Sequence, residues 1–185
     1  MNRYEIAIEE YESSEDDGKH KLIYAYFGLA IYFSQVLEET FSIMLWTDRI
    51  FKKKVKSNKE VNEIIDAIEN SKKTMGVFIN EVKQTYSLPE QLIESLKKVL
   101  EKRNYIVHKY FKLEIQKIAS DLGKREMLQY FCSFIDNVKE IDEELNKYYL
   151  DYKLRLGITE ETIDQLVKEM KEEELERELK INSNK

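Results

Sequence analysis

The chain contains few residues that break or constrain the backbone. Among its 185 residues are one proline, five glycines and one cysteine, whereas 36% of the residues are charged. Scarce proline and glycine with abundant charge favour long helices over strands and turns. The single cysteine, Cys132, excludes a disulfide within the chain. Because there is neither a signal peptide nor a long uncharged apolar run, we expect a cytoplasmic protein without a membrane partner.

Several kinds of functional site are also missing from the sequence. Its two histidines are far apart, and with one cysteine they give no metal-site spacing. The acidic segment SSEDDG lacks the regular ligand spacing of a calcium loop. There is no glycine-rich phosphate loop and no nucleophile elbow. We therefore expect no metal and no cofactor.

The net charge of −6 is unevenly distributed along the chain. Residues 1–17 hold one arginine against seven acidic residues, and residues 159–185 hold five basic residues against nine acidic ones. The middle, residues 18–158, is left with 24 basic and 20 acidic residues, a net charge of +4. Phosphate binding depends on local positive patches, so this distribution is compatible with a nucleic-acid partner.

Apolar residues at helical spacing predict helices separated by short connections. The spacing predicts a short helix over residues 1–12 and a long one over about 20–51, whose main apolar face consists of Leu22, Ala25, Leu29, Phe33, Val36, Thr40 and Ile43. The opposite face of this long helix is apolar too, so we expect it to be buried on both sides. Glu38 falls within that second face, and Gly28 suggests a close helix contact.

Capping signals place the remaining helices. Ser57–Glu60 and Ser87–Glu90 have capping-box spacing, so a helix is expected after each serine. From Lys124 a strict apolar seam predicts one long helix that ends at Gly157. The fold class is therefore all-α, an antiparallel helical bundle over residues 1–157, with an extra charged C-terminal helix over residues 158–185.

The segment RNYIVHKY, residues 103–110, departs from the helical pattern around it. The seam that runs through Val99 and Ile106 calls for an apolar residue at position 103, but the chain has Arg103 there, followed by Asn104 and His108. A buried arginine without a partner would be costly. We expect either that a carboxylate such as Glu38 meets Arg103 or that the helix opens there onto a pocket for an anion.

These side chains can support RNA cleavage. A guanidinium binds a phosphate and stabilises developing charge, and an imidazole transfers protons near neutral pH. His108 would act at the 2′-hydroxyl or the leaving 5′-oxygen, which makes RNA the natural substrate. Because one histidine can hardly be base and acid at once, a symmetric homodimer would supply the second. Taken singly, an arginine at such a position is more often a snorkelling or ion-paired side chain, and a histidine is more often a surface or edge residue than a catalyst.

The hexapeptide R-N-Y-I-V-H resembles the R-x4-H signature of the HEPN family (higher eukaryotes and prokaryotes nucleotide-binding). The resemblance covers about residues 20–150 and includes a preceding QxxE segment at Gln35 and Glu38. It implies a helical bundle that pairs through two such motifs, and a metal-independent endoribonuclease of a toxin–antitoxin or antiphage defence system. By this match Arg103 and His108 would be catalytic, with Asn104 supporting them.

The same resemblance implies regulation and partners. The H-K-Y pattern that ends at Tyr110 is similar to a subgroup whose tyrosine receives AMP from a nucleotidyltransferase antitoxin. Tyr110 would then be a site of regulatory modification, and the RNA substrate would be a tRNA or mRNA. Glu38 remains either a structural partner of Arg103 or a catalytic group. Two alternatives stay open: a non-catalytic HEPN-type nucleotide- or RNA-binding module, and a structural protein whose acidic C-terminal helix grips a basic partner.

Overall fold

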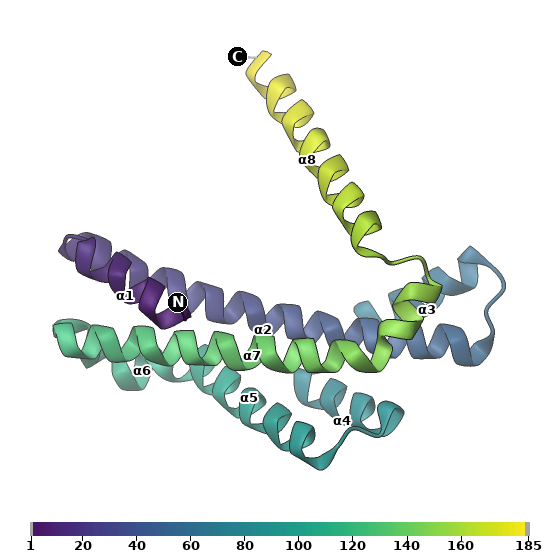
Figure 1. Cartoon of the computed structure of the whole chain (residues 1–185), viewed down its shortest axis with the longest axis horizontal. Helices are drawn as coiled ribbons and strands as arrows, with labels where there is room; N and C mark the ends of the chain where they lie inside the picture. Colours follow the sequence, from purple (N-terminus) through teal and green to yellow (C-terminus); the bar gives the residue numbers. More distant parts are fainter. Residues whose placement is uncertain (1, 184–185) are drawn as a thin grey trace. The chain divides into compact units, whose positions relative to one another are not determined.

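A computed structural model describes residues 2–183 and contains, within them, eight α-helices and one 3₁₀-helix but no β-strand (Figure 1). The helices are α1 (Arg3–Ser13), α2 (Asp16–Lys53), α3 (Asn58–Glu69), α4 (Met75–Tyr86), α5 (Glu90–His108), α6 (Tyr110–Glu114), η1 (Ile115–Ala119), α7 (Asp121–Arg155) and α8 (Glu160–Ser183). The predicted all-α bundle is confirmed. Across residues 2–183, none of the helices has the length and apolar character that crossing a membrane requires.

The chain divides into two compact units, residues 1–148 and residues 149–185. The first contains α1 to α6, η1 and most of α7, and the second contains the end of α7 and α8. In the second unit Gly157 adopts a left-handed φ of 74° after α7, as the sequence predicts. The hydroxyl of Thr159 accepts a hydrogen bond from the Thr162 N–H at 3.3 Å, which caps α8.

The first unit is built around its two long helices, α2 and α7 (Figure 1). Lys19 lies 4.0 Å from Asp121, and Thr40 donates a hydrogen bond of 2.5 Å to Asp142. Residues near the starts of the two helices therefore pair with each other, as do residues further along, so α2 and α7 run parallel. Helices α1 and α5 run in the opposite direction to both.

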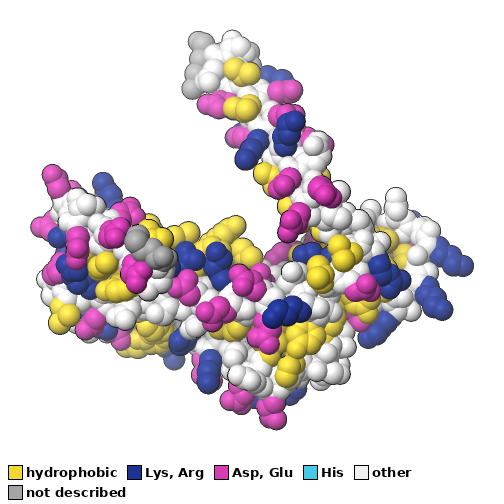
Figure 2. Space-filling view, viewed as in Figure 1, with side chains coloured by type: hydrophobic (Ala, Val, Ile, Leu, Met, Phe, Trp, Pro, Cys, Tyr) yellow, Lys and Arg dark blue, Asp and Glu magenta, His cyan; other side chains and the backbone are white. Residues whose placement is uncertain are grey.

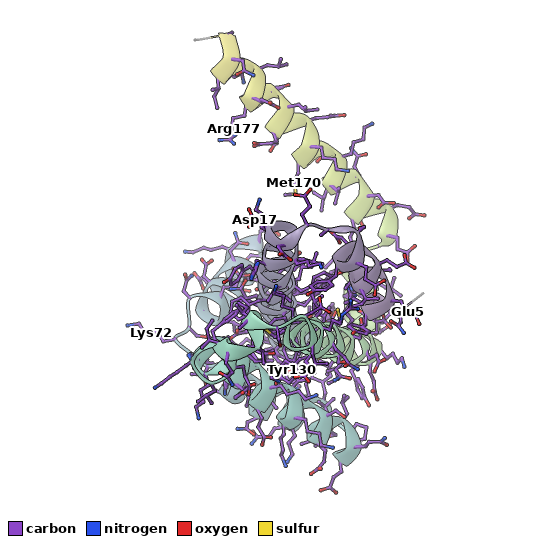
Figure 3. The ribbon with its side chains drawn as sticks, turned by 90° about the vertical axis from the view of Figure 1, so that its left-hand side faces the viewer. Glu5, Asp17, Lys72, Tyr130, Met170 and Arg177 are labelled. Atoms are coloured by element: carbon purple, nitrogen blue, oxygen red, sulfur yellow. The ribbon has the colours of Figure 1, made fainter. Side chains whose placement is uncertain are left out.

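The core of the first unit lies between these helices, and Figure 3 looks along them at the side chains that fill it. The seam predicted for α7 is confirmed from Met127 to Leu145, where each of its members is buried. Further buried side chains on α7 include Leu128, Cys132 and Ile135. The buried surface of α7 is therefore wider than one seam.

The predicted main face of α2 is wrong in its register. Ala25 and Leu29 are exposed, whereas the positions that are buried include Ile23, Tyr26, Ala30, Leu37, Phe41 and Met44. A helix that is apolar nearly all round offers two self-consistent faces, and periodicity alone does not choose between them. The choice is made by the helices that pack on α2, namely α1, α3, α4, α5 and α7, which leave uncovered a face of its first half that carries Tyr24, Leu29 and Tyr32.

Two of the predicted turns also differ from the structure. Ser57 caps α3 as expected, because its hydroxyl accepts a hydrogen bond from the Glu60 N–H at 3.3 Å. Ser87 instead has a left-handed φ of 50° and ends α4, while Pro89 is the residue that precedes α5. The expected turn SSEDDG shrinks to residues 14–15, since α2 already begins at Asp16.

Candidate functional site

The residues of the R-x4-H segment occupy the last turns of α5. Val99 and Ile106 are 2% exposed and anchor this part of the helix in the core. The helix ends at His108, because Lys109 leaves helical geometry with φ −131° and ψ −26°. Tyr110 then opens the short helix α6. The segment is therefore fixed on one side by packing and ends at a sharp break in the chain.

Arg103 lies at the edge of the core and meets the carboxylate that the sequence suggested. Its Nη2 is 3.9 Å from Oε2 of Glu38 on α2, and its Nη1 donates a hydrogen bond of 3.2 Å to Oδ1 of Asn104. The Nε atom is buried without a hydrogen-bond partner. The contacts with Glu38 and Asn104 restrict the guanidinium. The side chain is 25% exposed, so part of it stays open to solvent.

His108 has a different environment at the end of α5. It is exposed, and the described residues offer its side chain no hydrogen bond or ion pair. Five residues separate it from Arg103, which places the two side chains about 140° apart around the helix axis. One copy of the chain therefore does not turn both groups toward one point, although both are accessible at the same helix end.

Tyr110, the predicted acceptor of a modification, is almost completely buried. It is 2% exposed and stacks on the ring of Tyr130 with centroids 5.1 Å apart, and it also contacts Phe131 at 4.8 Å. Tyr130 is labelled in Figure 3. Burial raises the pKa of Tyr110 far above its usual range. Transfer of a group to this hydroxyl would require the corner between α5 and α6 to open.

A polar network beside the site was missed by the sequence analysis. The Tyr105 hydroxyl donates a hydrogen bond of 2.8 Å to Glu114, and Lys117 bridges Glu114 at 3.2 Å and Glu126 at 3.1 Å. The Tyr105 hydrogen bond lowers the pKa of Glu114. These contacts tie α5, α6, η1 and α7 together just after His108. No helical spacing indicates them, because the break at Lys109 changes the register between the partners.

A cavity of about 410 Å³ lies beside the Arg103–Glu38 pair. It is lined by Gln35, Glu38, Glu39, Ser42, Glu69, Ser71, Lys73 and Phe78. The QxxE residues of the sequence thus share one wall on α2. Burial, with a smaller contribution from the charge of Glu69, raises the pKa of Glu39. Within residues 2–183, no cluster of three or more His, Cys, Asp or Glu side chains is arranged to hold a metal ion.

Comparison of the chain with models of protein families, with curated proteins and with solved structures finds no match. The resemblance to the HEPN family therefore stays a prediction, which rests on the R-x4-H segment and its helical setting.

Proposed function

We propose that the protein is a metal-independent endoribonuclease of a toxin–antitoxin or antiphage defence system, and that it cleaves RNA as a homodimer. The observation that carries this proposal is the pairing of a restrained, partly exposed Arg103 with an unpaired, exposed His108 at one helix end. His108 makes no hydrogen bond or ion pair within the described residues, and Arg103 keeps part of its guanidinium open to solvent beside Glu38. The Arg103 guanidinium is suited to bind the phosphate of an external substrate, and the His108 imidazole is suited to exchange a proton with it.

The chemistry follows from the groups present. His108 takes the proton of the ribose 2′-hydroxyl, whose oxygen attacks the adjacent phosphorus, and the P–O5′ bond breaks. A second histidine gives a proton to the leaving 5′-oxygen, which leaves a cyclic phosphate on the other product. Arg103 stabilises the charge that develops on the phosphate oxygens, while Glu38 and Asn104 hold its guanidinium in place.

The uncovered face of α2 favours a second copy as the partner. Tyr24, Leu29 and Tyr32 are 52%, 38% and 56% exposed on this face. Gly28 lies among them, and a Cβ added there would meet no atom within 4 Å. The close helix contact expected at this glycine is therefore not made within the described residues. An exposed apolar helix face with a glycine at its centre is suited to another helix.

This face continues to the catalytic end of α5. The ring of Tyr24 lies 5.7 Å from that of Phe111, which follows His108 by three residues. Two copies packed through α2 around a twofold axis would each present His108 near the shared surface, so that one acts as base and the other as acid. The RNA target would be a tRNA or an mRNA, and a cognate antitoxin such as a nucleotidyltransferase would restrain the activity.

A second candidate is a non-catalytic nucleotide-binding module. The 140° between Arg103 and His108 favours it, since a single copy then offers an anion site without an opposed acid and base. The two candidates predict different results for the loss of His108: cleavage ends in the first, while binding persists in both.

The test is incubation of purified protein with total RNA in excess EDTA. We expect discrete fragments from the wild type and from His20→Ala, which removes the other histidine of the chain, but none from His108→Ala. Gly28→Glu, at an exposed position, should give a folded monomer without cleavage. Intact RNA with a folded wild-type dimer would refute the nuclease, and fragments from His108→Ala would remove His108 from the mechanism.

A further inference from the structure

The turn between α2 and α3 concentrates positive charge, of which only Arg49 and Lys52 are ion-paired within the described residues, with Glu81 at 3.5 Å and with Asp48 at 3.0 Å. Residues 49–59 contain six basic residues and no acidic one. Lys53, Lys54, Lys56 and Lys59 are exposed and make no ion pair within the described residues. Figure 2 shows Lys and Arg side chains gathered at this end of the first unit. We propose that this turn and the cavity beside it form a second RNA-binding site; the inference rests on the proposed RNA substrate.

The lysines are displayed on an ordered turn. Lys54 adopts the left-handed conformation, φ 51° and ψ 47°, and its N–H bonds to the carbonyls of Ile50 and Phe51. The Val55 N–H bonds to the carbonyl of Ile50 at 3.4 Å. A left-handed lysine is unfavourable by itself, so these bonds hold the turn in a defined shape. The lysine side chains therefore start from a fixed backbone, so phosphate binding has to order the side chains but not the turn that carries them.

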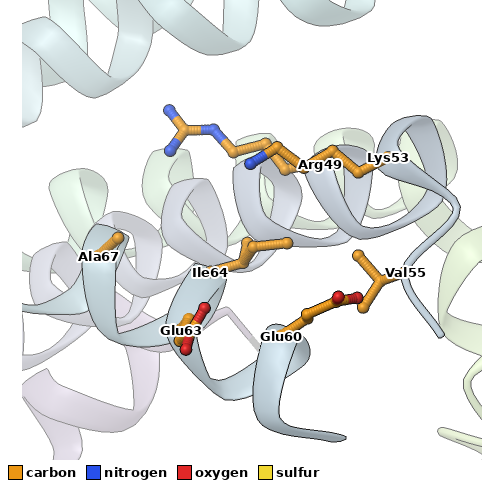
Figure 4. A pocket seen from close by; sticks show the side chains of 7 residues that line it. All are labelled: Arg49, Lys53, Val55, Glu60, Glu63, Ile64 and Ala67. Atoms are coloured by element: carbon orange, nitrogen blue, oxygen red, sulfur yellow. The ribbon is translucent and has the colours of Figure 1, made fainter. Parts of the chain in front are cut away.

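A cavity of about 590 Å³ adjoins the turn, and its two walls differ in charge (Figure 4). Arg49 and Lys53 come from α2, while Glu60 and Glu63 face them from α3. The remaining lining consists of the apolar side chains Val55, Ile64 and Ala67.

This arrangement fits a nucleotide better than a bare anion. A phosphate binds at Lys53 and at the part of the Arg49 guanidinium that its ion pair with Glu81 leaves open, while the carboxylates of Glu60 and Glu63 accept hydrogen bonds from ribose hydroxyls or from base amino groups. The apolar lining supports the flat face of a base. An inorganic polyphosphate has no hydrogen-bond donors for the acidic wall and is repelled by it. The cavity therefore selects a nucleotide unit from among polyanions.

The position of the site along α2 sets the length of RNA that reaches both sites. Fifteen residues separate Glu38, the partner of Arg103, from Lys53, and at 1.5 Å per residue they span roughly 22 Å. A stacked strand rises about 3.4 Å per nucleotide and needs about six nucleotides to span this distance, whereas an unstacked single strand is longer per nucleotide and spans it with fewer. A dinucleotide therefore reaches one site only, and an RNA of more than about six nucleotides reaches both in either form.

The experiment measures binding of fluorescently labelled single-stranded RNA in the non-cleaving His108→Ala background, by anisotropy at increasing salt. The test variant carries Lys53→Gln, Lys54→Gln and Lys56→Gln. The control carries Lys168→Gln, Lys171→Gln and Lys180→Gln on α8, an equal change of charge. For RNA of about twelve nucleotides, three lost contacts should reduce the slope of log K against log salt by about 2. The control should keep its slope, and a dinucleotide that binds at Arg103 should respond little.

Three results would overturn the inference. The first is an unchanged salt slope in the folded test variant, and the second is competition by inorganic polyphosphate as strong as that by RNA. The third is competition by a peptide of residues 160–183 that is stronger than competition by RNA, because the occupant would then be an acidic protein segment. The proposed nuclease is tested separately. Cleavage by the wild type with an unchanged slope would refute this site alone. A slope that falls as expected without cleavage by the wild type would refute the nuclease alone.

Discussion

Gly123 offers a sharp test of how the corner after the candidate site is built. It lies in the first turn of α7, where its N–H donates a hydrogen bond of 3.0 Å to the Ser120 hydroxyl. A Cβ at this position would lie 2.7 Å from the Cα of Lys117 and 2.8 Å from its carbonyl carbon, and closer still to the carbonyl oxygen. These are backbone atoms of η1, so no side chain can turn away to make room.

The expected loss on Gly123→Ala follows from two opposing effects. Overpacking typically costs about 1–3 kcal/mol, and contact with backbone atoms well inside van der Waals distance puts this site at the upper end. Alanine regains about 1 kcal/mol of helix propensity relative to glycine. The net loss is about 2 kcal/mol. For a chain of this size, 1 kcal/mol corresponds to a change in Tm of about 2–4 °C, so Tm should fall by roughly 4–8 °C.

Thermal unfolding followed by circular dichroism measures the change, and Gly28→Ala is the matched control. Gly28 lies within α2, and an added Cβ meets nothing within 4 Å inside one copy, so in a monomer only the gain in helix propensity applies. Both variants are therefore compared with the wild type at a dilution that dissociates the proposed dimer. The Tm of Gly28→Ala should rise by about 2–4 °C. If Gly123→Ala melted at or above the wild-type temperature, the close packing of α7 on η1 would be refuted.

Three further predictions concern pH, the arginine and the buried tyrosine. Burial raises the pKa of the Cys132 thiol to about 12 from 9.0, and burial with a hydrogen bond to a carboxylate raises that of Tyr11 to about 12 from 10.0. The native state therefore keeps protons that the unfolded chain releases, so stability is full below about pH 9 and falls as the pH rises toward 12. Urea midpoints should decrease over this range, and less so in Tyr11→Phe; a flat profile would contradict the assignment. Glu38→Gln should change the free energy of unfolding by about 1 kcal/mol or less, because its ion pair with Arg103 is partly exposed. The same substitution should lower the rate of the proposed RNA cleavage about 10- to 100-fold, because it releases the Arg103 guanidinium. Equal cleavage rates for variant and wild type would show that Glu38 has no positioning role. Tyr110→Ala should lower the free energy of unfolding by about 3–5 kcal/mol in chemical denaturation, and Tyr110→Phe should leave it near the wild-type value. A much smaller loss in Tyr110→Ala would mean that the corner between α5 and α6 is already open.

The long helices were predictable because their signals are redundant over many turns. In α7 the apolar residues from Met127 to Leu145 recur at one spacing, so every turn repeats the same prediction. In α2 apolar residues lie on all sides, and Leu29, a member of the predicted main face, is 38% exposed. Which face is buried depends on the other helices, and that information is not local to α2.

Short-range turn signals were less decisive for a related reason. Ser87 has the spacing of a capping residue, but the chain must reverse direction between α4 and α5 within three residues. Ser87 takes the left-handed conformation that makes the reversal, and Pro89 takes over the position before α5. Capping-box spacing indicates that a residue is able to cap a helix. The positions of the two neighbouring helices decide whether the residue acts as the cap.

The candidate site shows the same division between local and long-range information. Arg103 on an apolar seam implied a carboxylate partner by the cost of burying a charge, and Glu38 supplies it from a helix about 65 residues earlier. The break at Lys109 had no comparable signal, and the hydrogen bond from Tyr105 to Glu114 that depends on it was therefore missed as well. Because the break ends α5 at His108, the imidazole is free of the helix that follows while Arg103 remains anchored in the core. A fixed cation and an accessible proton carrier at one helix end are what a reaction on an incoming phosphodiester requires.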